Sequence, residues 1–287
     1  MPQLELQGRT LQFIDEGQGT PVVLLHSGGL SSRQWRSLAS ALRARHRVIA
    51  PDFIGYGGSS RLDPDAHFSF REDVEMICAL LATLAQPAHL VGHSYGGLVA
   101  LQAAVRNPAG VRSLSLYEPV AFGVLHGAAT ESVSAEADAA EAASAEALAT
   151  DNGGGNEAWL AGFVDWWQGA GAWVALPETT RANFIAVGRK TFLEVRSLLA
   201  DRTPAEAYRV IAAPALILAG ARSPHLEQRV CARLATALAS ARVETLPTAG
   251  HMGPLTHMSI VNAMISAHIG QYDLSARPPS PEMPKVL

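Results

Sequence analysis

A G-x-S-x-G motif at residues 92–96, set between a strand and a helix, constrains the fold of this chain more than any other feature. The apolar run from Ala88 to Val91 predicts a buried strand before the motif, and the run from Gly97 to Arg106 predicts a helix after it. A serine on so tight a turn is exposed, and glycines flank it because the crowded backbone leaves no room for side chains. The pattern therefore predicts Ser94 as a nucleophile, with backbone N–H groups and the positive end of the helix facing a developing oxyanion.

Strand and helix signals alternate along most of the chain. Apolar runs predict strands at residues 11–14, 21–26, 47–50, 88–91, 111–117, 215–219 and 243–246. Helical patterns fall at residues 31–44, 70–85, 97–106, 226–238 and 259–269. This alternation predicts an α/β protein with a mostly parallel central sheet and helices on both faces.

Length and composition indicate a globular protein. The chain has 287 residues, enough for one large domain or two smaller ones, with 48% hydrophobic and 17% charged residues. A net charge of −4 argues against nucleic acid as the main partner. We expect Cys78 and Cys231 to be free thiols. Because no signal peptide or membrane-spanning run is recognisable, we expect a cytoplasmic protein. We expect its partner to be a small-molecule substrate, with neither nucleic acid nor membrane involved.

Residues 120–205 interrupt the alternation and predict a helical cap inserted before the last two strands. This segment has an alanine-rich stretch at 131–150, and no Lys or Arg occurs from residue 113 to residue 180. We therefore expect an α/β core made of residues 1–119 and 206–270. The last residues, 271–287, carry four prolines and are predicted to form a loose tail.

Aromatic residues of the cap are candidates for substrate contact. Four of the chain's five tryptophans lie in this segment. We expect Trp159, Trp166 and Trp167 to contact substrate, together with Met252 from a loop near the C-terminal end of the chain. An alternative is that these large rings hold the cap to the body of the protein. A cap that is aromatic and lacks positive charge over its first half favours neutral, apolar or aromatic substrates.

A serine nucleophile needs a base, and His251 is the strongest candidate among ten histidines. It lies in the loop Ala249-Gly250-His251-Met252, after a predicted strand and before the last predicted helix. Such a loop lies at the same end of the sheet as Ser94. Hydrolases with a nucleophile of this kind place the residues in the order serine, acid, histidine.

The motifs together resemble the α/β-hydrolase superfamily over nearly the whole length of the chain. They are the segment His26-Ser27-Gly28-Gly29, the turn from Pro51 to Ser59, the Ser94 motif and Gly250-His251. The first segment is similar to the oxyanion loop of this family, with Ser27 in place of the usual glycine. The resemblance implies that the backbone N–H groups of Gly28 and Tyr95 form the oxyanion hole.

The acid of the triad departs from the commonest family pattern. Most members place an aspartate after the strand that follows the cap, as G-x-x-D, but this chain has Ser223 there. Glu118, directly after the strand that follows the Ser94 helix, is the alternative acid. Some haloalkane dehalogenases of the superfamily have an acid at this strand end. We therefore predict a triad of Ser94, Glu118 and His251.

Several reactions remain open on such a triad. Dehalogenases and epoxide hydrolases of the superfamily carry a carboxylate in place of Ser94, so hydrolysis of a carboxylic ester, lactone or thioester is the leading interpretation. Carbon–carbon bond hydrolases use the same triad but often carry tryptophan after the histidine, where this chain has Met252. Perhydrolases and cofactor-free haloperoxidases also resemble esterases. A non-catalytic ligand receptor on a hydrolase fold is an alternative of another class.

Metal and nucleotide cofactors are not expected. The chain has no H-E-x-x-H or C-x-x-C motif, and His251 and His257 are not at the spacing of one helix face. Gly55-x-Gly57 lacks the third glycine of a dinucleotide-binding motif.

Overall fold

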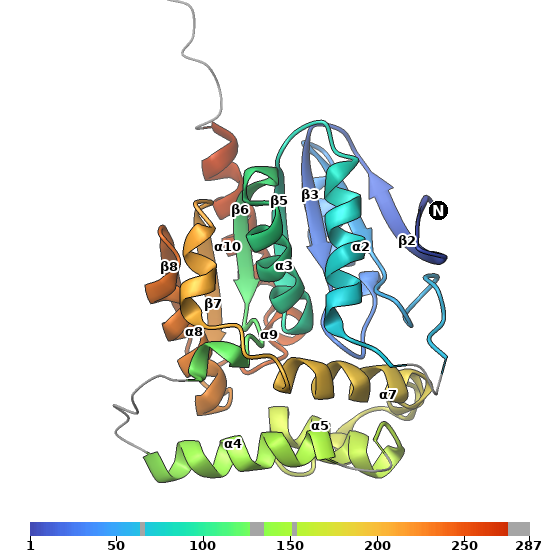
Figure 1. The fold of residues 1–287 in the computed structure, drawn as a ribbon, viewed down its shortest axis with the longest axis vertical. Coiled ribbons are helices and arrows are strands. Elements are labelled where there is room, and N and C mark those ends of the chain that lie inside the picture. The colour runs from blue at the N-terminus through green and yellow to red at the C-terminus, as the bar shows by residue number, and fades with distance from the viewer. Residues whose placement is uncertain (64–66, 127–134, 151–153, 275–287) are drawn as a thin grey trace, which may run out of the picture.

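A computed structural model describes residues 1–63, 67–126, 135–150 and 154–274 (Figure 1). Within these residues, eight strands form one sheet in the order β1-β2-β4-β3-β5-β6-β7-β8. The strand β2 is antiparallel to both of its neighbours, and the other pairs are parallel. The strands are β1 (Gln3–Leu6), β2 (Arg9–Glu16), β3 (Thr20–Leu25), β4 (His46–Pro51), β5 (Ala88–His93), β6 (Val111–Tyr117), β7 (Ala215–Gly220) and β8 (Ala241–Leu246).

Helices cover both faces of the sheet, as the alternating pattern predicts. The helices α2, α3 and α8 share one apolar cluster with the sheet, and α1 and α10 share another with its opposite face. The bounds are α1 (Arg36–Leu42), α2 (Phe70–Ala82), α3 (Tyr95–Arg106), α8 (His225–Ala237), α9 (Gly253–Thr256) and α10 (Met258–Leu274). Short 3-10 turns are η1 (Ser32–Trp35), η2 (Pro108–Gly110), η3 (Phe122–Leu125) and η4 (Ala205–Val210).

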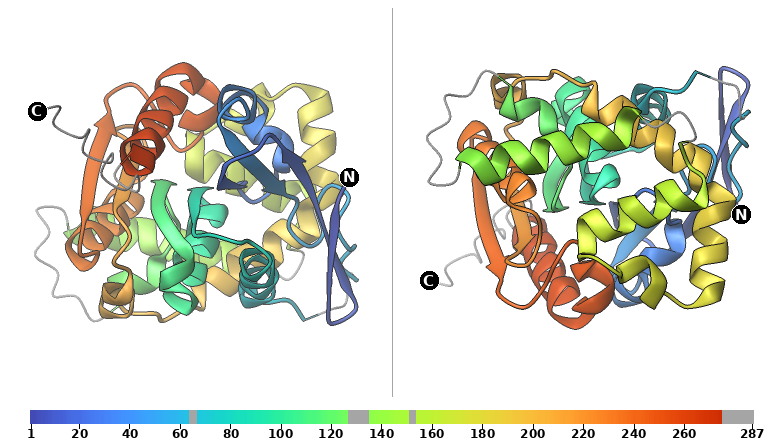
Figure 2. Two further views of the ribbon diagram at one scale, coloured as in Figure 1. Left: turned by 90° about the horizontal axis from the view of Figure 1, so that it is seen from above. Right: turned by 90° about the horizontal axis from the view of Figure 1, so that it is seen from below.

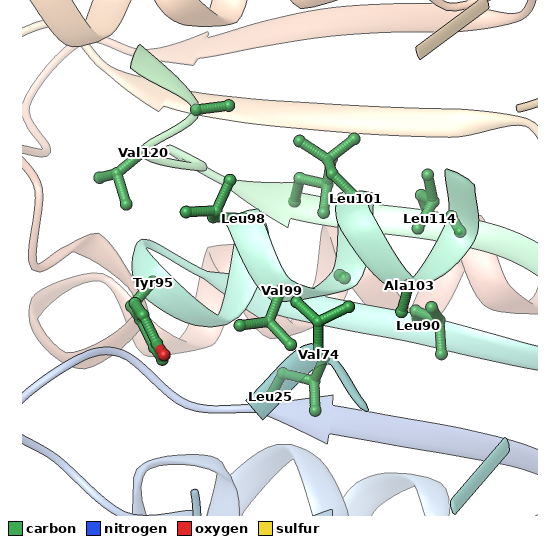
Figure 3. Packing of buried hydrophobic residues seen from close by; sticks show 14 of the residues in the cluster. Leu25, Val74, Leu90, Tyr95, Leu98, Val99, Leu101, Ala103, Leu114 and Val120 are labelled. Atoms are coloured by element: carbon green, nitrogen blue, oxygen red, sulfur yellow. The ribbon is translucent and has the colours of Figure 1, made fainter. Parts of the chain in front are cut away.

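The register of the central strands sets the geometry of the site. In the parallel pair of β5 and β6, His93 lies opposite Tyr117, so the residues that follow both strands emerge side by side. Val99 and Ala103 of α3 belong to one buried apolar cluster with Leu25 and Leu90 of the sheet, and Ala103 lies beside Leu90 in Figure 3. The helix after Ser94 is thereby fixed against the strands that carry it.

Four helices between β6 and β7 lie across the C-terminal ends of the strands (Figure 1; Figure 2, right). They are α4 (Ala135–Thr150), α5 (Glu157–Gln168), α6 (Ala172–Ala175) and α7 (Glu178–Leu199). Trp159, Leu160, Trp173 and Phe192 form an apolar cluster within these helices. This placement matches the helical insertion predicted before the last two strands.

The end of the described chain differs from the predicted loose tail. The helix α10 continues to Leu274, so residues 271–274 are helical, and 275–287 lie outside the described residues. Asp273 explains the continuation, because its carboxylate accepts hydrogen bonds from His46 (2.6 Å) and His89 (3.1 Å) of two sheet strands. None of the helices in the described ranges combines the length and the apolar character that crossing a membrane requires.

Candidate active site

Ser94 occupies a strained turn between β5 and α3. Its backbone has φ 54° and ψ −118°, values that side-chain-bearing residues rarely adopt. The turn is held because Ser94 N–H donates to Tyr117 O (2.9 Å) of the neighbouring strand. Gly96 allows it, since a Cβ atom there would lie 2.3 Å from Leu25 O, and one on Gly92 would lie 2.5 Å from Gly96 O. The turn therefore presents the Ser94 hydroxyl at the C-terminal end of the sheet.

The structure brings the three predicted triad residues together. The Ser94 hydroxyl lies 2.9 Å from Nε2 of His251, and Nδ1 of His251 lies 2.7 Å from Oε2 of Glu118. Ser94, His251 and Glu118 are 7%, 3% and 0% exposed, so the whole hydrogen-bonded chain is shielded from bulk water. In this arrangement Glu118 fixes the tautomer with the proton on Nδ1, which leaves Nε2 free to accept the serine proton.

Glu118 is held by Ser223, the residue at the position where the commonest family pattern predicts an aspartate. Its second oxygen, Oε1, accepts hydrogen bonds from the Ser223 hydroxyl (2.6 Å) and from Gly220 N–H (2.6 Å). Its backbone has φ 44°, and its N–H donates to Leu218 O (3.0 Å) of β7. Ser223 thus does not supply the acid but donates a hydrogen bond to it.

Two further contacts hold His251, one at its backbone carbonyl and one on its ring. His93 donates from Nε2 to His251 O (2.8 Å) and accepts at Nδ1 from the Gln34 amide (2.9 Å). Burial lowers the pKa of His93 well below its ordinary value, so this ring is neutral. On the open side, the indole of Trp167 stacks on the His251 ring with centroids 3.6 Å apart. The cap helix α5 therefore touches the predicted base directly.

A cavity between the cap and the sheet contains the Ser94 hydroxyl. Gly28 and Tyr95, the predicted oxyanion-hole residues, lie in its wall beside Ser94. The wall is otherwise mainly apolar and includes Val120, Phe122, Leu148, Phe163, Val164, Trp166, Trp167, Phe184, Val195, Leu198, Leu199 and Met252. A concave, mainly apolar wall with a few polar groups is typical of small-molecule sites.

The predicted substrate contacts divide into two groups. Trp166, Trp167 and Met252 line the cavity. Trp159 lies instead within the cap, where its ring stacks on Phe163 at 5.1 Å and its indole N–H donates to Leu148 O (2.8 Å). The expectation of substrate contact for Trp159 is corrected accordingly, because its face of α5 points into the cap cluster.

Sequence reasoning did not find two polar residues of the wall, Thr191 and Glu194 on α7. The only indication in the sequence is that Lys190 and Glu194 lie four residues apart on one helix. Such oppositely charged pairs are also common on exposed helices, so this spacing does not predict burial. Both side chains are buried in this structure, at 4% and 1% exposed.

The described residues offer no group of three or more His, Cys, Asp or Glu side chains arranged to hold a metal ion. Cys231 is buried and Cys78 half-buried, and both are free thiols.

Comparison with known proteins assigns the chain to a family. A model of the alpha/beta hydrolase family matches residues 22–263. The chain is 34% identical over 122 residues to a cis-3-alkyl-4-alkyloxetan-2-one decarboxylase of Shewanella oneidensis, covering 42% of this chain and 38% of that protein. It is 34% identical over 114 residues to a haloalkane dehalogenase of Agrobacterium fabrum, covering 39% of this chain and 37% of that protein. The matches thus span less than half the length of these curated relatives.

A solved structure extends the likeness to the whole fold. The enol-lactonase of Burkholderia xenovorans superposes with a TM-score of 0.71 at 20% identity, covering 94% of this chain and 100% of that one. At this identity the likeness concerns the fold alone. Since the family model spans most of the sequence and the architecture agrees with it, the chain belongs to the alpha/beta hydrolase family.

Proposed function

We propose that this protein is a serine hydrolase that cleaves a carboxylic ester, or a lactone or thioester, of a small neutral or apolar substrate. One observation carries the proposal: the continuous hydrogen-bonded chain from Ser94 through His251 to Glu118 at a cavity between cap and sheet. This chain has the geometry in which an imidazole can take the serine proton during attack on a carbonyl.

The reaction proceeds in two halves. Ser94 Oγ attacks the carbonyl carbon while its proton moves to Nε2 of His251, and Glu118 stabilises the imidazolium that forms. The carbonyl oxygen becomes an oxyanion that faces the N–H groups of Gly28 and Tyr95. The imidazolium returns its proton to the leaving alkoxide, which leaves an acyl group on Ser94. Water then attacks this ester with His251 as base, releasing the acid and restoring the serine hydroxyl.

The lining of the cavity supports a neutral substrate. Trp166, Trp167 and Met252 lie beside the triad, and apolar side chains of α5 and α7 form most of the remaining wall. An anionic acyl chain would lose its hydration in this setting, and the lining residues include no Lys or Arg to compensate its charge.

A serine-directed fluorophosphonate tests the proposal against a non-catalytic receptor. We expect intact mass spectrometry to show one equivalent bound to the wild-type protein and none to Ser94→Ala, since only an activated hydroxyl attacks phosphorus at a useful rate. A p-nitrophenyl ester series of increasing chain length then ranks acyl groups. A wild-type protein that stays unlabelled, or a Ser94→Ala variant labelled to the same extent, would contradict the proposed function.

A further inference from the structure

A buried carboxyl group lies in the cavity wall close to the predicted oxyanion hole. Glu194 is 1% exposed and lines the same cavity as Ser94. A Cβ atom placed on Gly28 would lie 2.7 Å from Oε2 of Glu194, so the carboxyl rests against the backbone of the oxyanion loop. A substrate whose carbonyl oxygen met Gly28 N–H would therefore have this carboxyl close to its reacting group.

Glu194 belongs to a buried cluster in which two carboxyl groups, those of Asp73 and Glu194, contact the single ammonium group of Lys190. Nζ of Lys190 lies 2.8 Å from Oδ2 of Asp73 and 2.7 Å from Oε1 of Glu194. Asp73 also accepts from the Tyr95 hydroxyl (2.7 Å) and from Ile54 N–H (2.9 Å), so it already compensates the ammonium. The charge of Lys190 therefore does not by itself account for Glu194.

The carboxyl is fixed in place yet retains acceptor capacity. The Tyr56 hydroxyl donates to Oε2 of Glu194 (2.7 Å) and accepts from Gly29 N–H (2.9 Å) in the oxyanion loop. With one donor on each oxygen, an ionised Glu194 has lone pairs left for a ligand. Burial raises the pKa of Glu194 to about 7, with Lys190 and Tyr56 opposing the shift, so both the acid and its anion occur near neutral pH.

We propose that Glu194 is a specificity-determining residue that recognises a hydroxyl group on the acyl part of the substrate, one or two carbons from the scissile carbonyl. The inference rests on the proposed function and names its substrate class, a hydroxyacyl ester. A hydroxyl donates to the carboxylate and accepts from the carboxylic acid, so it matches both states of Glu194. A keto group only accepts, and an anion is repelled by the ionised state. An ammonium group would lose its hydration among apolar walls with a single acid to face.

Matched esters test the proposal. We compare phenyl butyrate with phenyl 2-hydroxybutyrate and phenyl 3-hydroxybutyrate by kcat/KM, each divided by its rate with hydroxide alone to remove differences in carbonyl reactivity. The wild-type protein should prefer at least one hydroxy ester by about ten- to a hundredfold, the range of one buried hydrogen bond to an ionisable group. Glu194→Leu should bring this ratio to about one, and Glu194→Gln, which keeps an acceptor, should preserve part of it.

The ratio separates recognition from structural support. A Glu194 that only braced the oxyanion loop would, when replaced, slow both esters alike and leave the ratio unchanged. Gln168→Leu is the control, because Gln168 is another polar residue of the wall but lies at the end of α5, and it is not among the nearest neighbours of a Cβ atom on Gly28. It should leave the preference for the hydroxy ester intact.

Three kinetic results would overturn the inference: a wild-type ratio near one, an unchanged ratio in Glu194→Leu, or faster cleavage of phenyl 3-aminobutyrate than of the hydroxy esters. Calorimetry on Ser94→Ala keeps these results distinct from failure of the proposed function. That variant should bind the favoured hydroxy ester at least about tenfold tighter than phenyl butyrate. Equal binding of the two esters refutes recognition by Glu194, whatever the labelling of Ser94 shows. The wild-type ratio and the calorimetry on Ser94→Ala both leave Glu194 unchanged, so they do not depend on whether a Glu194 variant folds.

Discussion

Two buried glutamates lie near the triad, and only one of them contacts the base. Glu118 bonds to His251, whereas the pKa of Glu227 lies well above its ordinary value, chiefly through burial and also through the charge of Glu118. We expect Glu118→Gln to lower kcat on an ester about a thousand- to ten-thousandfold, because the amide cannot stabilise the imidazolium. Glu227→Gln replaces a neutral acid by a neutral amide of the same shape and should leave kcat nearly unchanged. Similar kcat values for the two variants would contradict the assignment of Glu118.

A substitution of Ser223 gives a second test of the assignment of Glu118 as the acid of the triad. Its hydroxyl lies 2.6 Å from Oε1 of Glu118, so an aspartate introduced at 223 would approach the same place in the triad. We expect Ser223→Asp combined with Glu118→Gln to recover part of the activity that Glu118→Gln loses. Ser223→Asp alone should be impaired, because two carboxylates would then share one site. If the double variant is no faster than Glu118→Gln, the position after β7 cannot orient His251 in this chain.

Among the structural elements, the turn between β5 and α3 leaves no room for a side chain at Gly96. A Cβ atom on Gly96 would meet Leu25 O at 2.3 Å and His26 O at 2.5 Å, and both are backbone atoms that cannot rotate away. We expect Gly96→Ala to lower the free energy of unfolding by about 1–3 kcal/mol or more. The matched control is Gly162→Ala in α5, where a Cβ atom would meet nothing within 4 Å. Alanine there should raise stability by about 0.4–1 kcal/mol.

Urea unfolding followed by circular dichroism measures both changes. The two variants add the same methyl group, so they differ only in the space around it. Equal midpoints for Gly96→Ala and the wild-type protein would show that the turn can open without cost, and the strained geometry assigned to Ser94 would then be wrong.

Elements that are buried on both faces could be predicted from sequence, whereas those that depend on neighbours could not. The strands β3 and β5 could be predicted because each contains a continuous apolar run. The order of the triad residues along the chain predicted Glu118 and His251 once Ser94 was identified. The edge strand β1 was missed, because Gln3–Leu6 is short and half exposed. Trp159 and Trp167 are both tryptophans of the cap, so the sequence could not distinguish their roles. The rotation of α5 about its axis decides which ring reaches the cavity. The burial of Glu194 likewise follows from the position of α7.

For the whole molecule, the buried ionisable groups set the response to acid. Burial is the main cause that lowers the pKa of His26 and His268 to about 4, of His93 well below its ordinary value, and of His89. Unfolded histidines, with a pKa of about 6.5, take up protons that the folded forms refuse, so stability is lost as the pH falls below about 6.5. Glu194 and Glu227 act in the opposite sense, because their raised pKa values make the folded state bind protons at a higher pH than the unfolded state does.

Because four histidines are opposed by two glutamates, we expect a net uptake of protons on unfolding below about pH 6.5, and each proton taken up contributes roughly 1.4 kcal/mol per pH unit. We therefore expect the urea midpoint to fall as the pH is lowered through this range. His268→Phe removes one of the four histidines and should make the dependence shallower, whereas Glu227→Gln removes an opposing group and should make it steeper. A midpoint that stays constant or rises on acidification would mean that these histidines are protonated in the folded protein, and the neutral His93 that bonds to His251 O would lose its basis.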